Sequence, residues 1–588
     1  MKRFGIDLGT TNTVIYCAES TIKISDEDEE NFSLQPVPVQ YENTGDLLSP
    51  GGTDTYIMPS ALYAVPTAML TGDYEYYIGN VAVKMAIQHN DVCTINTKRL
   101  LCREENTDTV IAYGLTAQDI AQKFLEGCKF SIIKFLSGDT AEKKFSLSDH
   151  CVTRPAAFGL FANQSIHAAA KMAGFRKAAV QREPIAALLS LMYSELKEKE
   201  SAERLFEKQK KHGGKLLTIV VDIGGGTTDV TIQEICVKGQ RKKETTDYSG
   251  ICTGYHIEFL NMVKDKDDDK NAPVAAANQV QAFGGYEFDR EIVSHIIAEW
   301  LEKYQAMTGE KLALDTKEMK QSIEKLYIRV RDYKNSLSLD ARERHDEVKI
   351  NGKMIETVWS AEKFYEWTKE LCISPPNKTE NAQTIYGIIT DTIRRSNYNI
   401  DDIDYFFVTG GMSFYKPIRE MLKEKFSGLS EKDILIFSEN PLYDIAIGAA
   451  VCDCYFSVKM PQSFLYCDLM IDDPCGDPKK KKKKNTALPI THTIDKFMKL
   501  RNPVYFQIDV LSGNGINDCK MKYLRKLKKP IAESGHKVAE IGTDISVKYT
   551  IDVHQSMSLE LIVHDPLEEY SVTLVDLIKD VDLIGGRN

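Results

Sequence analysis

The chain of 588 residues lacks the features that define several large classes of protein. It contains no run of 18 apolar residues, so the sequence predicts no membrane-spanning helix. Its start, MKRFGIDLG, has no apolar signal-peptide core, and its 13 cysteines are scattered rather than arranged as a dense disulfide framework. The net charge of −11 argues against a dedicated nucleic-acid binder, which usually has a basic surface. We therefore expect a cytoplasmic globular protein with free thiols that binds neither membrane nor nucleic acid.

Two common nucleotide-binding motifs are also absent, because the chain has neither a GxxxxGK[ST] loop nor a GxGxxG segment that opens a helix. It has instead a repeated hairpin, FGIDLGTTNTVIY from Phe4 and VVDIGGGTTDVTI from Val220. Each copy is an apolar strand that ends in Asp, followed by a glycine turn, two threonines and a β-branched strand. The aspartates, Asp7 and Asp222, lie 215 residues apart. A duplication at this scale predicts two related lobes that face each other.

Strands alternate with helices up to about Lys459, which indicates an α/β architecture. A strand is expected at 404–411, and the charged segment 195–211 predicts a solvated extension of the helix before it. Gly448 would permit close packing of the last helix. The helices are expected at 165–174, 183–196, 287–338 and 440–453.

The sequence changes character after Lys459. The segments 503–512, 544–553 and 557–565 predict strands separated by turns, and a basic piece near 520–529 is helix-like. The lysine run at 479–484 predicts an exposed turn. We expect a small all-β domain here.

The repeated hairpins can cradle phosphate, because glycines let backbone N–H groups approach an anion and threonine hydroxyls add donors. Asp7, Asp222 and Asp229 would repel phosphate there unless a divalent cation lies between them, and magnesium held largely through water fits this need. The arrangement predicts a phosphoryl-transfer site. The phosphate-binding candidates are Gly9, Thr10 and Thr11 on one side and Gly224, Gly225, Gly226 and Thr227 on the other.

Further segments extend this pattern along the chain: NTKRLL at 96–101, VTRPAAF at 152–158, REPIAALL at 182–189, FGGYEFD at 283–289, VTGGMS at 408–413 and NPLYDIAIGAAV at 440–451. Together with the hairpins they resemble the 70-kDa heat-shock protein (DnaK-type) chaperone family of the actin-like ATPase superfamily. In the tail, 483–497 and 544–553 look like that family's β-type peptide-binding domain. The resemblance implies a two-lobed actin-like ATPase fold built from duplicated α/β subdomains and followed by a small all-β domain. The implied bounds are 1–457 for the nucleotide-binding domain (lobes about 1–200 and 215–457), 458–470 for a linker and 471–588 for the substrate-binding domain.

The resemblance also implies roles for single residues. Lys98 would meet the terminal phosphate, and Glu183 would help to organise the metal and the attacking water. The implied catalytic set is Lys98, Glu183, Asp222, Asp7 and Asp229, and the implied metal set is Asp7, Asp222 and Glu183, mostly through water. The cofactor, ATP or ADP with Mg²⁺, would contact Gly9, Thr10, Thr11, Asn12, Gly224, Gly225, Gly226, Thr227, Thr228, Glu287, Lys334, Ser338, Gly410, Gly411, Met412 and Phe414.

The sequence departs from the family at the expected nucleoside pocket. Arg331 stands where the family has Glu, Asn335 where it has Arg, and Phe414 where it has an adenine-stacking Arg; Leu442 replaces an acidic residue. A ring at Phe414 can stack on a base but lacks fixed donors and charge. After the last strands we expect no room for the family's helical lid, and the linker at 463–474 matches only loosely. These departures concern the choice of base and the coupling between domains, not the phosphate groups.

The first hypothesis is a slow magnesium-dependent ATPase that works as a chaperone. It would bind extended apolar peptides or unfolded proteins, and the resemblance implies a J-domain co-chaperone and a nucleotide-exchange factor as partners of a monomer. The alternative is a nucleotide-binding regulatory or scaffold protein with little ATPase activity and one dedicated partner. A filament-forming actin relative and a small-molecule kinase are weaker alternatives, because neither accounts for the β-rich tail.

Overall fold

A computed structural model describes most of the chain up to residue 459 and the strands beyond it. The described residues are 2–20, 32–39, 56–67, 74–89, 91, 93–95, 97–102, 109–155, 160–175, 178–239, 255–260, 278–281, 283–337, 342–374, 383–396, 398–459, 467–472, 480–481, 491–499, 505–512, 520–526, 544–551, 557–564 and 569–574.

The first lobe, which we call lobe I, is built on a mixed sheet with the order β3-β2-β1-β7-β8, and β4 pairs with β2. The strands β1 and β2 form an antiparallel hairpin, whereas β7 runs parallel to β1 and β8 parallel to β7. A second hairpin joins β5 and β6. The strands are β1 Lys2–Leu8, β2 Asn12–Ser20, β3 Phe32–Pro36, β4 Ile57–Pro59, β5 Leu62–Pro66, β6 Tyr74–Ile78, β7 Asp149–Arg154 and β8 Ala179–Arg182. The helices are α1 Gly79–Gln88, η2 Thr97–Cys102, α2 Ala117–Leu136, α3 Ala141–Leu147, α4 Leu160–Met172, α5 Glu183–Lys197 and α6 Lys199–Lys211.

Lobe II repeats this plan. Its sheet has the order β17-β11-β10-β9-β15-β16, and β12 pairs with β10. The strands β9 and β10 form the antiparallel hairpin, and β15 and β16 are the parallel strands. The predicted α/β fold with duplicated lobes is confirmed. The strands are β9 Leu216–Ile223, β10 Thr228–Lys238, β11 His256–Leu260, β12 Asn278–Gln281, β13 Arg344–Ile350, β14 Lys353–Trp359, β15 Tyr405–Thr409, β16 Leu435–Phe437 and β17 Ser457–Lys459. The helices are α7 Gly285–Thr308, α8 Lys317–Ser336, α9 Ala361–Cys372, α10 Ile385–Ser396, η4 Ile400–Asp402, η5 Gly411–Phe414, α11 Lys416–Lys425, α12 Ser427–Ser430 and α13 Asp444–Val451.

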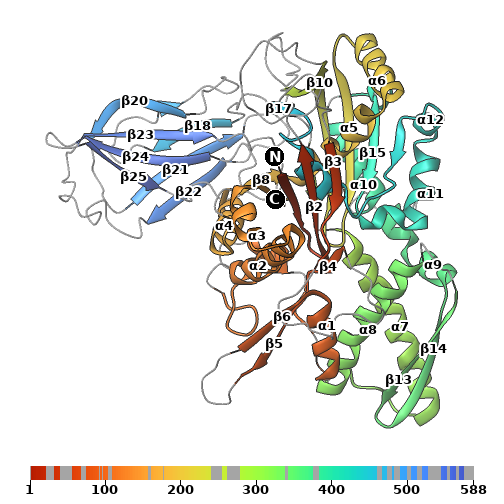
Figure 1. The fold of residues 1–588 in the computed structure, drawn as a ribbon. Helices are drawn as coiled ribbons and strands as arrows, with labels where there is room; N and C mark the ends of the chain where they lie inside the picture. Colours follow the sequence, from red (N-terminus) through yellow and green to blue (C-terminus); the bar gives the residue numbers. More distant parts are fainter. Residues whose placement is uncertain are drawn as a thin grey trace.

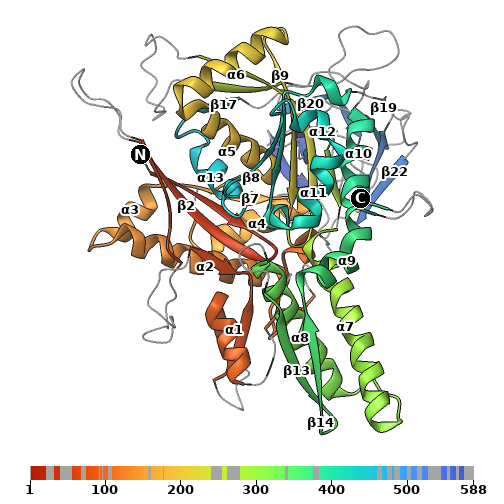
Figure 2. The same cartoon turned by 90° about the vertical axis from the view of Figure 1, so that its right-hand side faces the viewer.

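Two helices tie the lobes together, and each packs on the sheet of the other lobe. Helix α5 follows the last strand of the lobe I sheet but packs on β9 and β15, whereas α13 follows β16 and packs on β1, β2 and β7. The helices also contact each other closely, since a Cβ atom at Gly448 would lie 1.7 Å from the carbonyl oxygen of Ala186. The expectation for Gly448 is therefore confirmed, and its neighbour is α5. Figure 1 labels α5, and Figure 2 labels both helices, which lie next to each other.

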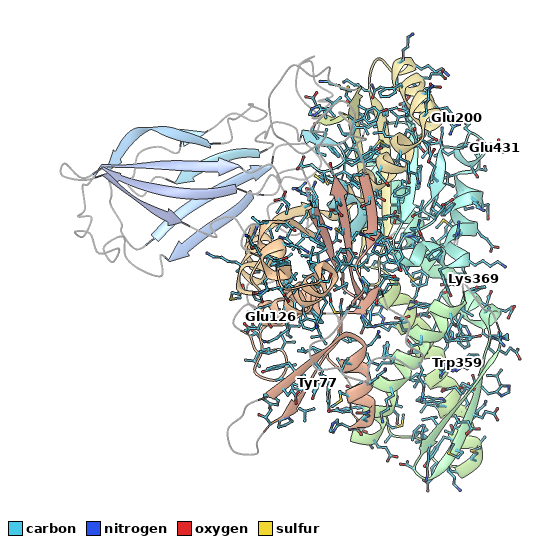
Figure 3. The ribbon with its side chains drawn as sticks, in the orientation of Figure 1. Tyr77, Glu126, Glu200, Trp359, Lys369 and Glu431 are labelled. Carbon is cyan, nitrogen blue, oxygen red and sulfur yellow. The ribbon has the colours of Figure 1, made fainter. Side chains whose placement is uncertain are left out.

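The predicted helices are present, with one correction. The charged segment after α5 does not continue that helix, because Glu198 has extended backbone angles (φ −105°, ψ 129°) and α6 begins anew at Lys199. Figure 3 labels Glu200 on this exposed helix and Trp359 at the end of β14. Trp359 is fully buried in the lobe II core, next to Tyr333 and Phe364.

The described elements beyond residue 459 are all strands. They form two four-stranded sheets with the orders β19-β18-β21-β22 and β20-β23-β24-β25, drawn in blue in Figure 1. The expected helix-like piece near 520–529 is wrong over Lys520–Lys526, which is strand β22, and Lys480–Lys481 of the lysine run pair with β18 as β19. The bounds are β18 Cys467–Asp472, β19 Lys480–Lys481, β20 Thr491–Lys499, β21 Tyr505–Ser512, β22 Lys520–Lys526, β23 Asp544–Ile551, β24 Met557–His564 and β25 Glu569–Leu574.

Among the described residues, none of the helices has the length and apolar character needed to cross a membrane. The predicted domain bounds are not tested by these features and stay a prediction.

Candidate active site

A cavity of about 850 Å³ lies between the two lobes. The turns of both repeated hairpins line it, together with the first residues of α5 and α7, helix α8 and the segment that includes η5. Most of the residues singled out from the sequence meet there. Those that line the cavity are Asp7, Gly9, Thr10, Thr11, Asn12, Lys98, Glu183, Asp222, Gly224, Gly225, Gly226, Thr227, Lys334, Gly410, Gly411, Met412 and Phe414.

The two hairpin turns approach each other across the cavity. A Cβ atom at Gly225 would lie only 1.9 Å from Thr11 Oγ1 of the other lobe. Within lobe I, a Cβ atom at Gly9 would lie 2.1 Å from the carbonyl oxygen of Asn12. Glycine is therefore required twice: once to close the turn of lobe I, and once to let the two turns come together.

The start of α7 holds the turn of lobe II. The backbone N–H groups of Gly285 and Tyr286 donate to the carbonyl oxygens of Gly224 (3.0 Å) and Gly225 (2.7 Å). A side chain at Gly284 would clash with this turn, since its Cβ atom would lie 2.7 Å from the carbonyl oxygen of Gly224. The FGGYEFD segment thus positions the second phosphate-loop candidate.

Two of the predicted cofactor contacts that the structure describes are not found on the cavity wall. Thr228 is fully buried and donates from Oγ1 to the carbonyl oxygen of Phe283 at 2.7 Å. Glu287 accepts a hydrogen bond from the backbone N–H of Gly284 at 2.7 Å and so caps α7. Both residues support the turn of lobe II rather than line the cavity. Ser338 lies outside the described residues.

A buried ion pair lies at the phosphate end of the cavity, the end formed by the two hairpin turns. Lys98 in η2 donates from Nζ to Oε1 of Glu183, the first residue of α5, and their side chains are 5% and 6% exposed. Nearby, Thr153 donates from Oγ1 to Asp7 Oδ1 at 3.1 Å. The Lys98–Glu183 pair joins two segments that are 85 residues apart in the sequence.

Three carboxylates form a compact cluster beside this pair: single ligand atoms of Glu183, Asp222 and Asp229 lie within 4.8 Å of one another. The hairpin register explains why Asp229 joins Asp222, because the two residues face each other across β9 and β10. The matching pair in lobe I is Asp7 and Val14, so that lobe contributes one carboxylate where lobe II contributes two. The predicted metal set was Asp7, Asp222 and Glu183, whereas the cluster in the structure contains Asp229 instead of Asp7.

The electrostatics of this group favour an added cation. Burial, followed by the charge of Glu183, raises the pKa of Asp7 to about 7, while Lys98 and Thr153 oppose the rise. Burial and the charges of Asp229, Glu183 and Asp7 raise the pKa of Asp222 well above its usual range. Burial disfavours the charged form of Lys98, but Glu183 and Asp7 outweigh it and raise its pKa. One ammonium thus faces four carboxylates, and oxygen ligands of this kind suit Mg²⁺.

Asp222 also shows an open coordination position. Its Oδ1 atom is buried and accepts no hydrogen bond from any described residue. Gly410, with φ +83°, passes so close that a Cβ atom there would lie 2.2 Å from Oδ1. A buried carboxylate oxygen without a donor is costly unless a cation reaches it. The residues present therefore fit a divalent cation.

The other end of the cavity, which we call the nucleoside end, is organised by Asp289. Lys334 Nζ lies 2.6 Å from Asp289 Oδ1 and donates to the carbonyl oxygen of Gly285 at 2.9 Å. Arg331 Nε lies 3.3 Å from Asp289 Oδ2. Burial lowers the pKa of Lys334, and Asp289 opposes this shift. Arg331, Asn335, Phe414 and Leu442, the four departures noted in the sequence, all line this end.

Sequence reasoning missed Asp289, although it lies within the FGGYEFD segment. The sequence offered only its position as an acidic residue four places after Gly285. Pairing with two cations of α8 depends on how α7 and α8 pack, which the sequence does not specify.

The model of the family described as Hsp70 protein matches residues 3–254 and 269–554, which is most of the chain.

Proposed function

The chain belongs to the Hsp70 family of nucleotide-binding chaperones, and from this premise we propose that it is a slow, magnesium-dependent ATPase whose nucleotide state controls peptide binding. The observation that carries the proposal is the buried Lys98–Glu183 pair beside the carboxylates and between two glycine turns. Such a site supplies positioning and charge neutralisation, which dominate phosphoryl transfer.

Each part of the site has a role in this proposal. The turns of the two hairpins would bind the phosphates through backbone N–H groups and threonine hydroxyls. Glu183, Asp222 and Asp229 would hold Mg²⁺, with Asp7 nearby, largely through water. When bound, the ion would neutralise the charge that the triphosphate brings to these carboxylates. Lys98 would turn its ammonium to the terminal phosphate, and Glu183 would then be free to accept a hydrogen bond from the attacking water.

The proposal extends to the strands beyond residue 459. We propose that they bind extended apolar peptides or unfolded proteins, and that ATP and ADP states differ in this affinity. A J-domain co-chaperone and a nucleotide-exchange factor are the proposed partners, with the protein acting as a monomer in the cytoplasm. The support for this step is the family membership and the two four-stranded sheets.

The test is hydrolysis and binding of ATP, GTP and ADP by the full chain, with and without magnesium. Wild type should hydrolyse ATP slowly, and Asp222→Asn should lose hydrolysis. The control is Lys171→Ala on the exposed part of α4, which should behave as wild type. Binding of fluorescent unfolded peptides, measured with ATP and then with ADP, tests the coupling. Identical peptide affinity in the two states would contradict the chaperone cycle.

A regulatory or scaffold protein with little hydrolysis remains the second candidate. The observation that favours it is the nucleoside end, where Arg331 and Phe414 replace the residues typical of the family. This candidate predicts tight nucleotide binding without turnover and one dedicated partner instead of many unfolded peptides.

A further inference from the structure

The charged residues of the cavity wall fall into two groups of opposite net charge. Asp7, Glu183, Asp222 and Lys98 form the first group, with three carboxylates and one ammonium. The second group lies on α7, α8, α9 and α11 and consists of five cations and three carboxylates, a net charge of +2. The cations there are Arg331, Lys334, Lys416, Arg419 and Lys423, and the carboxylates are Asp289, Glu362 and Glu420.

Ion pairs account for only part of this positive charge. Arg331 and Lys334 share Asp289, and Lys416 Nζ lies 3.7 Å from Glu420 Oε1. Arg419 and Lys423 form no ion pair with any residue in the part of the chain that the structure describes. They lie four residues apart on α11, where two like charges on one helix face repel each other.

An aromatic ring holds these two cations in place. The guanidinium carbon of Arg419 lies 4.6 Å from the ring centroid of Phe437, and Lys423 Nζ lies 5.9 Å from the same centroid. Phe437 is the last residue of β16, so its position is fixed by the lobe II sheet. A ring face attracts cations and offsets the repulsion between them. The two side chains are therefore held together at the cavity wall.

We propose that Arg419 and Lys423 form a subsite for a second phosphate group of the nucleotide, one that is not part of its 5′-phosphate chain. This inference rests on the proposed function, because it takes the hairpin turns as the site of the 5′-phosphates. An arginine fork suits phosphate oxygens, and a neighbouring ammonium adds a point charge. The ligand class is a nucleotide that carries a phosphate on its sugar in addition to its 5′-phosphates.

A single cavity joins the two anion-binding ends, which favours one ligand over two separate ions. Its volume of about 850 Å³ falls in the range of small-molecule sites, about 300–1,000 Å³. A ligand with anionic groups at both ends gains from both contacts at once, because the second contact is intramolecular after the first.

The experiment compares matched nucleotides by calorimetry at fixed ionic strength. Adenosine 3′,5′-bisphosphate and adenosine 2′,5′-bisphosphate are each compared with AMP. At least one bisphosphate should bind wild type at least about tenfold more tightly than AMP, as a charge-assisted contact to phosphate implies. The gain should disappear in the double variant Arg419→Gln/Lys423→Gln and shrink in Phe437→Leu.

The matched control is Lys425→Gln. Lys425 lies on the same helix but does not line the cavity, and its Nζ lies 3.0 Å from Glu424 Oε1. A gain for one bisphosphate alone identifies which hydroxyl of the sugar carries the phosphate. If AMP binds but neither bisphosphate binds more tightly, the subsite is overturned and the proposed function stands. If no nucleotide binds at all, both are overturned.

Discussion

The two ends of the cavity are built in opposite ways from the same duplicated fold. The phosphate end combines two glycine turns with four carboxylates and one buried ammonium. The nucleoside end has an excess of cations and includes Arg331, Asn335, Phe414 and Leu442, where the sequence departs from the resemblance described above. Under the proposed function, phosphate chemistry and the choice of base rest on separate sets of residues, so one can change while the other persists.

The largest effect is expected from Lys98→Ala. Hydrolysis should fall by at least about 100-fold, because a preorganised positive charge at the phosphate is lost. The variant also leaves Glu183 buried and unpaired, which should lower the free energy of unfolding by about 3–5 kcal/mol. Single-turnover hydrolysis and denaturant unfolding measure the two losses.

A second variant separates catalysis from folding in this test. Lys98→Met with Glu183→Gln removes both charges, so stability should recover while hydrolysis does not. Recovered hydrolysis in the double variant would show that the Lys98–Glu183 pair is structural, and would contradict its proposed role in catalysis.

Gly225→Ala should give the next largest effect, by forcing the two lobes apart. Its Cβ atom would lie 1.9 Å from Thr11 Oγ1. Overpacking of this kind costs about 1–3 kcal/mol, so ATP affinity should fall about tenfold in a calorimetric titration. In a Thr11→Gly background, which itself lacks a candidate phosphate donor, Gly225→Ala should cause no further loss, since the obstructing side chain is gone.

The control for this variant is Gly239→Ala, where a Cβ atom would meet nothing within 4 Å. A further tenfold loss when Gly225→Ala is added to Thr11→Gly would contradict direct contact between the turns.

The next prediction concerns the pH dependence of stability at His150, which does not line the cavity. Burial, followed by the charge of Arg3, lowers the pKa of His150 from 6.5 to about 4, and its ring packs against Phe145 and Phe175. The unfolded chain therefore takes up a proton at a higher pH than the folded one. The free energy of unfolding should fall by about 3 kcal/mol as the pH drops from 6.5 to 4.

The measurement is denaturant unfolding at a series of pH values, for wild type and His150→Phe. The difference between the two curves should be largest below pH 5 and constant above pH 7. An equal slope for both proteins between pH 6.5 and 4 would show that other groups cause the dependence.

The smallest effect is expected from Arg331→Gln at the nucleoside end. Asp289 keeps its partner Lys334 at 2.6 Å, so stability should change by less than about 1 kcal/mol. The value of kcat should stay within about twofold of wild type, while KM for different bases shifts. Steady-state kinetics with ATP and GTP tests this. A large fall in kcat would show that the nucleoside end also takes part in catalysis, which contradicts the separate roles of the two ends.

Much of the fold could be predicted, because the repeated hairpin carries a period-two pattern and a glycine turn in each copy. The assignment of Thr228 failed because Thr227 lies in the turn and lines the cavity, whereas Thr228 begins β10 and donates its hydroxyl to Phe283. Glu287 was assigned to the nucleotide, but its spacing from Gly284 is that of a helix cap.

Other features depend on packing between distant segments. The contact between Thr11 and Gly225 and the pairing of Asp289 with α8 join residues that no local pattern connects. The break at Glu198 was hidden because the charged residues on both sides favour a helix. Asp229 was expected near the cation from the sequence, and the register of β9 and β10 adds that it lies directly opposite Asp222.

The most direct test of the account is a calorimetric titration of the full chain with ATP, with and without Mg²⁺, in wild type and Asp222→Asn. We predict that Mg²⁺ strengthens binding to wild type at least about tenfold, because the carboxylates otherwise repel the phosphates. Asp222→Asn should lose most of this dependence on Mg²⁺ while still binding nucleotide. Equal affinity of wild type for ATP with and without Mg²⁺ would contradict the assignment of the phosphate end.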